Sequence, residues 1–302
     1  MSPVTVQTAM NSLMSEIHVP YESEFALGAS TSYRIGGNAR ILGRPESVEQ
    51  LAHLTSMCQE NGIAIHMLGS GANLLVRDEG VDLAIRFDSP AFSGLSIDGN
   101  RVTVGAGYDV AKLTLDMARA GLSGLECMAG IPASVGGAVR MNAGGAFGEI
   151  GTHIVRVRVM DDAGNVRDIP RESLVFDYRH ANIEEPYIIE VEFELTSGDA
   201  DDVRNRVKDV FAYKKASQPL GDKSAGCTFK NPEPTVSAGQ LIDQAGLKGF
   251  CIGGAEVSDC HANFIVADPD AKTADVIAVM EHIEETVFRK FGVSLQREVV
   301  VW

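Results

Sequence analysis

Three segments of the sequence combine glycine with small polar residues: RIGG at 34–37, GSGANLLV at 69–76 and GIPASVGGAVRMNAGG at 130–145. Glycine permits left-handed turns and close approach of the backbone to a ligand, and successive backbone amides can bind an anion such as a pyrophosphate. None of the three has the GxGxxG spacing between a strand and a long helix. Tight turns in a β-rich domain are the alternative, but the three segments together favour a nucleotide cofactor.

Three single residues could carry the chemistry of a reaction. Arg179, in FDYRH, has the planar guanidinium that binds a carboxylate through two parallel hydrogen bonds. Cys227, in SAGCTFKNP, could present a thiol, and Glu298 precedes the apolar end of the chain. A carboxyl group that is buried there has a raised pKa and becomes a candidate acid. The alternatives are a surface arginine, an inert buried thiol and a solvated strand edge.

The elements around the glycine-rich segments can be read from caps and periodicity. Ser47 is the predicted N-cap of a helix that stops at Gly62, and the strand that follows runs into the second segment. Asp109 is the predicted cap of a helix that ends at Gly121, before the third segment. Turn residues at 98–100 and 162–165 predict two β-hairpins.

The last third of the chain has the pattern of an α+β unit that follows a long helix. Valines and Phe211 on one face predict a helix over 201–217, which should end before Pro219. AGQLIDQAG and KTADVIAVMEHIEETVFRKF are predicted helices, ANFIVA lies between them as a predicted strand, and EVVVW is a predicted final strand. We therefore expect a domain boundary at about Lys214–Pro219.

Composition excludes several classes of protein. The 26 basic and 41 acidic residues give a net charge of -15, which repels nucleic acid and anionic membrane surfaces. The five cysteines are odd in number and have no CxxC spacing, which argues against a disulfide framework and a zinc site and favours a reducing cytoplasm. The first twenty residues have no signal-peptide pattern, and no run approaches the ~18 apolar residues of a membrane span.

Taken in order, these strings resemble the UDP-N-acetylenolpyruvoylglucosamine reductase family along nearly the whole chain from about residue 25. TSYRIGG, LGSGANLLV, GIPASVGGAVRMNAGG, FDYRH, KKASQPL, SAGCTFKNP, AGQLIDQAGLKGFCIGGAEVSDCHANFIV and QREVV match in order and spacing. The chain lacks room for an insertion that one of the two family types carries, so it resembles the shorter type.

The resemblance implies an α+β fold: an FAD-binding domain of the vanillyl-alcohol-oxidase (PCMH) type with a separate C-terminal α+β substrate domain. The expected divisions are an N-terminal arm at 1–24, the FAD-binding domain at 25–200 with lobes at about 25–87 and 88–200, a helix and linker at 201–218, and a substrate domain at 219–302. The terminal strand is expected to return towards the flavin.

The resemblance also assigns site residues. Arg179 would bind and polarise the substrate carboxylate, Cys227 would donate a proton, and Glu298 would help to stabilise the enolate-like intermediate. Tyr178, Lys230 and Asn231 would face the substrate. The FAD contacts would be Arg34, Ile35, Gly36, Gly69, Ser70, Gly71, Ala72, Asn73, Leu74, Gly130, Ile131, Pro132, Ser134, Val135, Gly136, Gly137, Asn142, Ala143 and Gly144.

Three positions depart from the family pattern. Cys227 and Ala72 stand where serine is more usual, and residues 145–148 are a variant of the family's aromatic loop. A thiol, with an ordinary pKa of about 8.5, is a far stronger acid than a hydroxyl and fits nearly the same space.

The implied reaction is the reduction of UDP-N-acetylenolpyruvoylglucosamine to UDP-N-acetylmuramate in peptidoglycan synthesis, and so in cell-wall biogenesis, cell shape and cell division. FAD and NADPH would be its cofactors. A cytoplasmic monomer that binds neither nucleic acid nor a membrane nor a metal is expected. Two alternatives remain: another FAD-dependent oxidoreductase of this fold that acts on an alcohol or hydroxy acid, and a non-catalytic UDP-sugar-binding protein.

Overall fold

The computed structural model describes residues 10, 11 and 13–302, and the chain divides into two compact units. The first unit contains the N-terminal residues up to Phe25, Arg40–Ser70 and Asp82–Tyr213. The second contains Ala26–Ala39, Gly71–Val81 and Lys214–Trp302. The units are described separately below.

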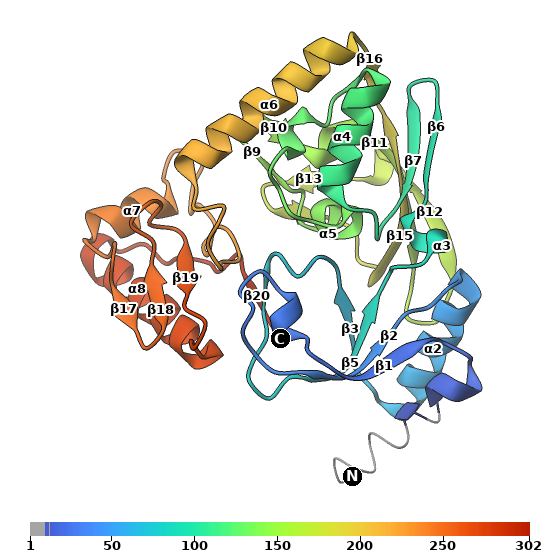
Figure 1. Ribbon diagram of the computed structural model, residues 1–302, viewed down its shortest axis with the longest axis horizontal. Coiled ribbons are helices and arrows are strands. Elements are labelled where there is room, and N and C mark those ends of the chain that lie inside the picture. The colour runs from blue at the N-terminus through green and yellow to red at the C-terminus, as the bar shows by residue number, and fades with distance from the viewer. Residues whose placement is uncertain (1–9, 12) are drawn as a thin grey trace. The chain divides into compact units, whose positions relative to one another are not determined.

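Two sheets dominate the first unit (Figure 1). A four-stranded sheet has the order β1-β2-β5-β3, with β3 and β5 parallel. A five-stranded antiparallel sheet has the order β12-β11-β15-β7-β6. The strands are β1 (Tyr21–Phe25), β2 (Ala39–Gly43), β3 (Ile65–Leu68), β5 (Val81–Arg86), β6 (Leu95–Asp98), β7 (Arg101–Gly105), β11 (Ile154–Met160), β12 (Val166–Pro170) and β15 (Tyr187–Glu194).

Short strand pairs and helices complete this unit. The pairs are β8 (Leu122–Ser123) with β16 (Thr196–Ser197), β9 (Gly144–Gly145) with β10 (Gly148–Glu149), and β13 (Phe176–Asp177) with β14 (His180–Ala181). The helices are α2 (Val48–Asn61), α3 (Pro90–Ser93), α4 (Val110–Ala120), α5 (Val135–Arg140) and α6 (Ala200–Ser217), with 3-10 turns η2 (Glu126–Met128), η3 (Ile150–His153) and η4 (Arg171–Ser173).

The predicted caps and hairpins of the first unit are confirmed. The Ser47 hydroxyl accepts a hydrogen bond from the Gln50 amide at the start of α2, and the Asp109 carboxylate accepts one from the Lys112 amide at the start of α4. Gly62 and Gly121 end these helices in the left-handed conformation, where glycine meets little steric cost. The predicted hairpins are β6–β7 and β11–β12.

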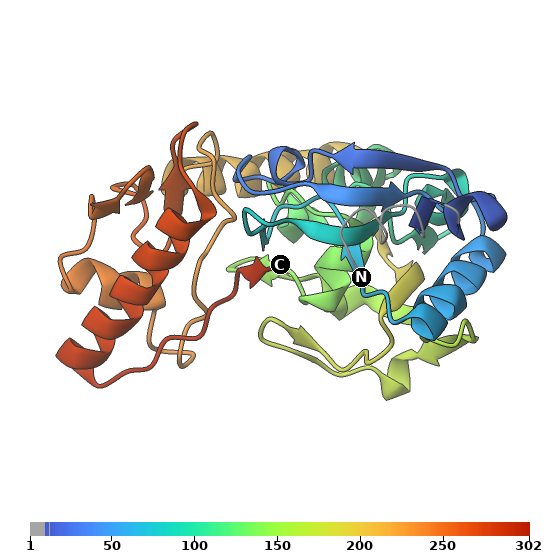
Figure 2. The ribbon, with the colours of Figure 1, turned by 90° about the horizontal axis from the view of Figure 1, so that it is seen from below.

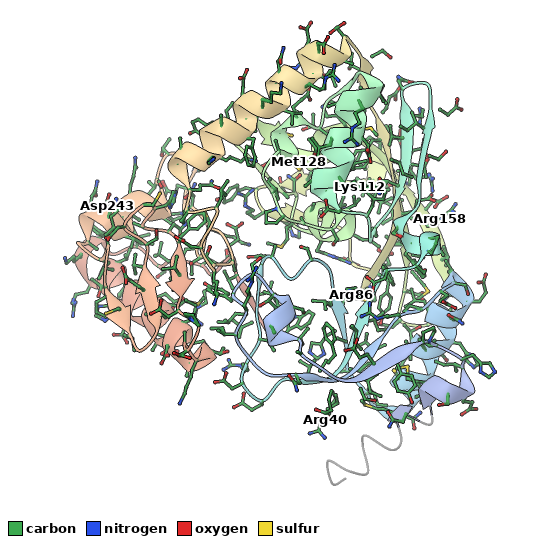
Figure 3. The ribbon with its side chains drawn as sticks, viewed as in Figure 1. Arg40, Arg86, Lys112, Met128, Arg158 and Asp243 are labelled. Atoms are coloured by element: carbon green, nitrogen blue, oxygen red, sulfur yellow. The ribbon has the colours of Figure 1, made fainter. Side chains whose placement is uncertain are left out.

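Alternation along the strands separates a core face from a charged face. Val157 and Val159 of β11 are buried, whereas Arg156 and Arg158, which alternate with them, form ion pairs with Asp168 of β12. Arg158 is labelled in Figure 3, as is Lys112 of α4. Helix α5 packs against β15 and β7, so the third glycine-rich segment is held against the five-stranded sheet.

The second unit has its own α+β core. An antiparallel sheet of β17 (Cys251–Ile252), β18 (Ala255–Val257) and β19 (Ile265–Ala267) is packed by α8 (Thr273–Phe291), as Figure 2 shows. The other elements are η1 (Gly28–Ser30), β4 (Leu74–Leu75), α7 (Ala238–Gln244) and β20 (Val300–Val301), which pairs with β4 in parallel. The helices and strands predicted after Pro219 are therefore present.

The grouping of segments differs from the expected one in two places. Residues 26–39 and 71–81, expected within the FAD-binding domain, are compact with the C-terminal residues. The physical reason is burial, because Tyr33, Ile35 and Leu75 lie in the same apolar cluster as Phe229 and the α8 residues. In addition, the Thr273 hydroxyl donates to the Val76 carbonyl at 2.6 Å.

Part of the predicted N-terminal arm is ordered structure. Residues 1–9 and 12 lie outside the described residues, while residues 13–16 are helical and Met14, Ile17 and Val19 are buried in the core of the first unit. These described residues of the arm therefore belong to the hydrophobic core.

Candidate active site

The segment that contains Cys227 lies alongside the segment that contains Glu298. The Thr228 carbonyl accepts a hydrogen bond from the Glu298 amide at 2.8 Å, and the Lys230 amide donates to the Gln296 carbonyl at 2.8 Å. Phe229 pairs with Arg297 in an antiparallel bridge. In this register Glu298 is opposite Thr228, one residue from Cys227. The structure therefore places the segments that contain two of the three predicted catalytic residues side by side.

Asn263 fixes the backbone next to Cys227. It is only 3% exposed, and its carbonyl accepts from the Thr228 amide at 2.7 Å. Its side chain accepts from the Phe229 amide at 3.0 Å and donates to the Phe229 carbonyl at 2.8 Å. The sequence reasoning did not single out Asn263. The signal that could have identified it is a polar residue inside the apolar run ANFIV, since a buried amide must have hydrogen-bond partners.

Tyr33, which immediately precedes the first glycine-rich segment, packs beside the backbone around Cys227. It is fully buried, and its hydroxyl lies beside the Thr228 hydroxyl and the Ala225 backbone. Burial holds the pKa of Tyr33 above its ordinary value, so the neutral phenol is retained. Tyr33 thus packs beside this stretch, whereas Asn263 fixes the residues after Cys227 by hydrogen bonds; Cys227 itself is half-buried.

The second glycine-rich segment is attached to the Glu298 strand. The Asn73 side chain donates to the Glu298 carbonyl at 3.0 Å, and the Val300 amide donates to the Asn73 carbonyl at 3.1 Å. The parallel pairing of β4 with β20 continues this contact. Residues 71–76 of this segment and both predicted acids, separated by more than 150 residues in the sequence, are therefore part of one unit.

Lys230 and Asn231 follow Cys227 by three and four residues and lie in the same unit. Lys230 is half-buried, and Asn231 is exposed. The Asn231 side-chain oxygen accepts from the Ala238 amide at 3.0 Å, at the first residue of α7. The position of Asn231 is therefore tied to the start of that helix.

Arg179 belongs to the first unit, where it occupies the two-residue turn between β13 and β14. Asp177 pairs with His180 across this turn, and Arg179 itself is left-handed at φ 54°. Its guanidinium lies 5.1 Å from the ring centroid of Tyr178, a cation–π contact that involves an exposed ring. A tight hairpin thus presents Arg179 and Tyr178 together, whereas Cys227 and Glu298 lie in the second unit.

The glycine-rich segments of the first unit have the features of a cofactor cradle. The Ser70 hydroxyl donates to the Pro132 carbonyl at 3.2 Å, and a Cβ at Gly69 would lie 2.5 Å from the Ser134 hydroxyl. Gly69, Ser70, Pro132 and Gly137 are all exposed. A backbone that is exposed and close-packed at the same positions is the kind that binds phosphates through amides.

The glycine-rich segments of the second unit also require glycine. Gly36 has φ 105°, and a Cβ there would collide with the Val76 carbonyl. Gly71 has φ 70°, and its Cβ would lie 3.0 Å from Thr31 Cα. Packing within the protein therefore requires glycine at both positions, and cofactor binding by these segments stays a prediction. Asn142, another expected FAD contact, is fully buried and bonded to other protein groups.

Among residues 10, 11 and 13–302, no helix is long and apolar enough to cross a membrane. Within the same residues, no three His, Cys, Asp or Glu side chains are grouped as they would be to hold a metal ion.

Two family models match the chain. Residues 39–169 match the FAD-binding domain model, and residues 218–302 match the model of the C-terminal domain of UDP-N-acetylenolpyruvoylglucosamine reductase. These matches confirm the predicted fold class, an FAD-binding domain with a separate C-terminal domain.

Curated relatives and a solved structure agree with these models. The chain is 43% identical to the UDP-N-acetylenolpyruvoylglucosamine reductase of Heliobacterium modesticaldum over 90% of its own length and 87% of the relative. It is 38% identical to that of Halalkalibacterium halodurans over 91% of each chain. The crystal structure of the Thermus caldophilus enzyme superposes with a TM-score of 0.79 at 36% identity and covers 94% of this chain and 98% of that one.

Proposed function

The chain belongs to the UDP-N-acetylenolpyruvoylglucosamine reductase family, and on this premise we propose which of its residues carry out the reaction. It is an FAD- and NADPH-dependent oxidoreductase of peptidoglycan precursor synthesis, and it reduces UDP-N-acetylenolpyruvoylglucosamine to UDP-N-acetylmuramate. FAD bound to the protein would supply the hydride chemistry, with NADPH as the source of the hydride and the enolpyruvyl double bond as its destination. The three glycine-rich segments, including Gly36, Ser70, Gly71 and Gly137, would hold FAD.

Arg179 would bind the carboxylate of the enolpyruvyl group. Hydride addition to one carbon of the double bond pushes negative charge towards this carboxylate, and a guanidinium with two parallel donors stabilises that charge better than a point cation. The support is the hairpin of β13 and β14, which fixes Arg179 at a turn with its neighbour Tyr178 exposed beside it.

Cys227 would complete the reduction by giving its thiol proton to the other carbon of the former double bond. The Glu298 side chain would help to stabilise the enolate-like state from which that proton transfer occurs. The observation that carries this assignment is the antiparallel pairing of the two segments, with the hydrogen bond from the Glu298 amide to the Thr228 carbonyl at 2.8 Å. In this pairing Glu298 is opposite Thr228, the residue that follows Cys227.

Lys230 and Asn231, which follow Cys227, would face the UDP-sugar together with Tyr178. We also propose that the protein works as a cytoplasmic monomer of 32.3 kDa. The five free cysteines suit a reducing compartment. Light scattering of the purified protein at several concentrations tests the monomer, and a mass that doubles with concentration would refute it.

The Arg179→Lys variant tests the proposed carboxylate contact. It keeps the charge but loses the planar pair of donors, so reoxidation of the reduced flavin by the enolpyruvyl substrate should slow by ~10-fold or more. Bleaching of the flavin by NADPH should stay near the parental rate. Arg119→Lys is the matched control, because Arg119 is exposed on α4 of the same unit, where it forms an ion pair with Asp116. Parental kcat and KM in Arg179→Lys would remove this role.

A further inference from the structure

The first unit contains a fully buried asparagine whose side chain joins three backbone segments. Asn142 is 0% exposed. Its amide nitrogen donates to the Glu149 carboxylate at 2.7 Å and to the Asp177 carbonyl at 3.0 Å, and its oxygen accepts from the Gly151 amide at 3.1 Å. Both N–H groups of the side chain are thus engaged within the protein.

These bonds connect the third glycine-rich segment to the turn that contains Arg179. Asp177 is the last residue of β13 and pairs with His180 across the Tyr178–Arg179 turn. The Asp177 carbonyl that Asn142 binds is therefore two residues from Arg179.

The backbone at Asn142 is suited to asparagine. Its φ is 42°, in the left-handed region that asparagine and aspartate enter more readily than other non-glycine residues. Gly151, the donor to its oxygen, cannot have a side chain, because a Cβ there would collide with the ring of Phe176, the residue before Asp177. Asn142, Gly151 and Phe176 thus form one packed unit beneath the Arg179 turn.

We infer that Asn142 is a positioning residue for Arg179. By binding the Asp177 carbonyl, it fixes the turn from which Arg179 binds the substrate carboxylate. This inference rests on the proposed role of Arg179. It differs from a role as an FAD contact through the side chain, because the N–H groups that would reach a cofactor are already bonded to Glu149 and Asp177.

Asn142→Asp is the sharpest variant. It keeps the size of the side chain, the tolerance of a left-handed φ and the acceptor for the Gly151 amide, but it removes both donors. FAD content and bleaching by NADPH should stay within about 3-fold of the parent. Reoxidation by the enolpyruvyl substrate should slow by ~10- to 10²-fold, and KM for that substrate should rise. The new buried carboxyl group beside Glu149 lowers the thermal midpoint under either account, so the readout is the split between the half-reactions. A purely structural residue would affect both half-reactions alike.

Glu149→Gln separates the two bonds that Asn142 donates. Alone, this variant still offers an oxygen to Asn142, so both half-reactions should stay near parental. In the double variant with Asn142→Asp, the amide at position 149 can donate to the carboxylate at position 142. The bond between these two side chains is then restored with donor and acceptor exchanged, and thermal stability should recover. The bond to the Asp177 carbonyl stays broken, so reoxidation should stay slow. Recovery of reoxidation in the double variant would overturn the inference.

Arg179→Ala distinguishes failure of the inference from failure of the proposed function. Arg179→Ala should slow reoxidation, and adding Asn142→Asp to it should cost less than about 3-fold more, because both changes remove the same contact. Parental kinetics in Arg179→Ala would refute the proposed function. A slow Arg179→Ala with a parental Asn142→Asp, or with fully multiplicative losses, would refute the inference alone.

Discussion

At the scale of single residues, the candidate site depends on how the backbone on both sides of Cys227 is held. Sequence motifs identified Cys227 and Glu298 by type and order, and the structure places their segments side by side. The motifs could not identify Tyr33 or Asn263, because their contribution comes from hydrogen bonds and burial between distant parts of the chain. A single sequence contains no direct record of such pairs.

His261 makes the support of this backbone sensitive to pH. Its Nδ1 accepts from the Asn263 amide at 3.2 Å. Burial, together with the nearby charge of Lys248, lowers the pKa of His261 below its ordinary value. The unfolded chain therefore takes up a proton as pH falls through about 6.5, while the folded protein resists. The contribution of His261 to the free energy of unfolding is therefore fully present above about pH 6.5 and is lost as the pH falls below that value.

The measurement is the free energy of unfolding by urea between pH 7.5 and 5.5. The parent should lose stability as the pH falls, and His261→Gln should show a smaller loss over the same range. His53→Gln, at an exposed position on α2, is the control and should keep the parental slope. Equal slopes in the parent and His261→Gln would refute the coupling.

At the scale of elements, local chemistry predicted most boundaries. Ser47 and Asp109 cap the helices they were expected to cap, and glycines end both helices. The pairing of β4 with β20 was not predicted, because a parallel contact between two-residue strands more than 200 residues apart has no local signal. This pairing nevertheless connects the second glycine-rich segment to the Glu298 strand.

Gly71 tests whether that segment binds the cofactor. Gly71→Ala introduces a Cβ 3.0 Å from Thr31 Cα at φ 70°, so the loop must shift and the FAD content of the purified protein should fall. Gly99→Ala is the matched control, with φ 59° and open space around its Cβ in the β6–β7 turn. It should cost similar backbone strain without loss of FAD. Equal FAD content in both variants would show that the Gly71 loop is only a turn.

At the scale of the whole molecule, the family and fold class were predictable, whereas the grouping of segments was not. Ordered motifs cover most of the chain, and this order predicted the FAD-binding fold and the C-terminal domain. Residues 26–39 and 71–81 lie near the N-terminus but share their core with residues 214–302. Membership of a core depends on three-dimensional burial, which sequence order does not determine.

FAD should stabilise the protein as a whole, because a ligand that binds only the folded state shifts the unfolding equilibrium. At a concentration of 100 times its Kd, it adds about 2.7 kcal/mol, or a rise of about 4 °C in the thermal midpoint of a chain of this size. Calorimetry of the flavin-free protein with and without added FAD measures the rise. Riboflavin, which lacks the pyrophosphate and adenosine, should give a smaller one. A thermal midpoint that FAD leaves unchanged would contradict the cofactor assignment.

Anaerobic stopped-flow kinetics of Cys227→Ala tests whether Cys227 donates the proton that completes reduction of the enolpyruvyl group. NADPH should bleach the flavin at close to the parental rate, because that half-reaction needs no proton at carbon. Reoxidation by the enolpyruvyl substrate should slow by ~10² to 10⁴, the usual scale for a lost general acid, and Cys227→Ser should recover much of the loss. Parental reoxidation in Cys227→Ala would contradict this role and leave proton donation to water or Glu298.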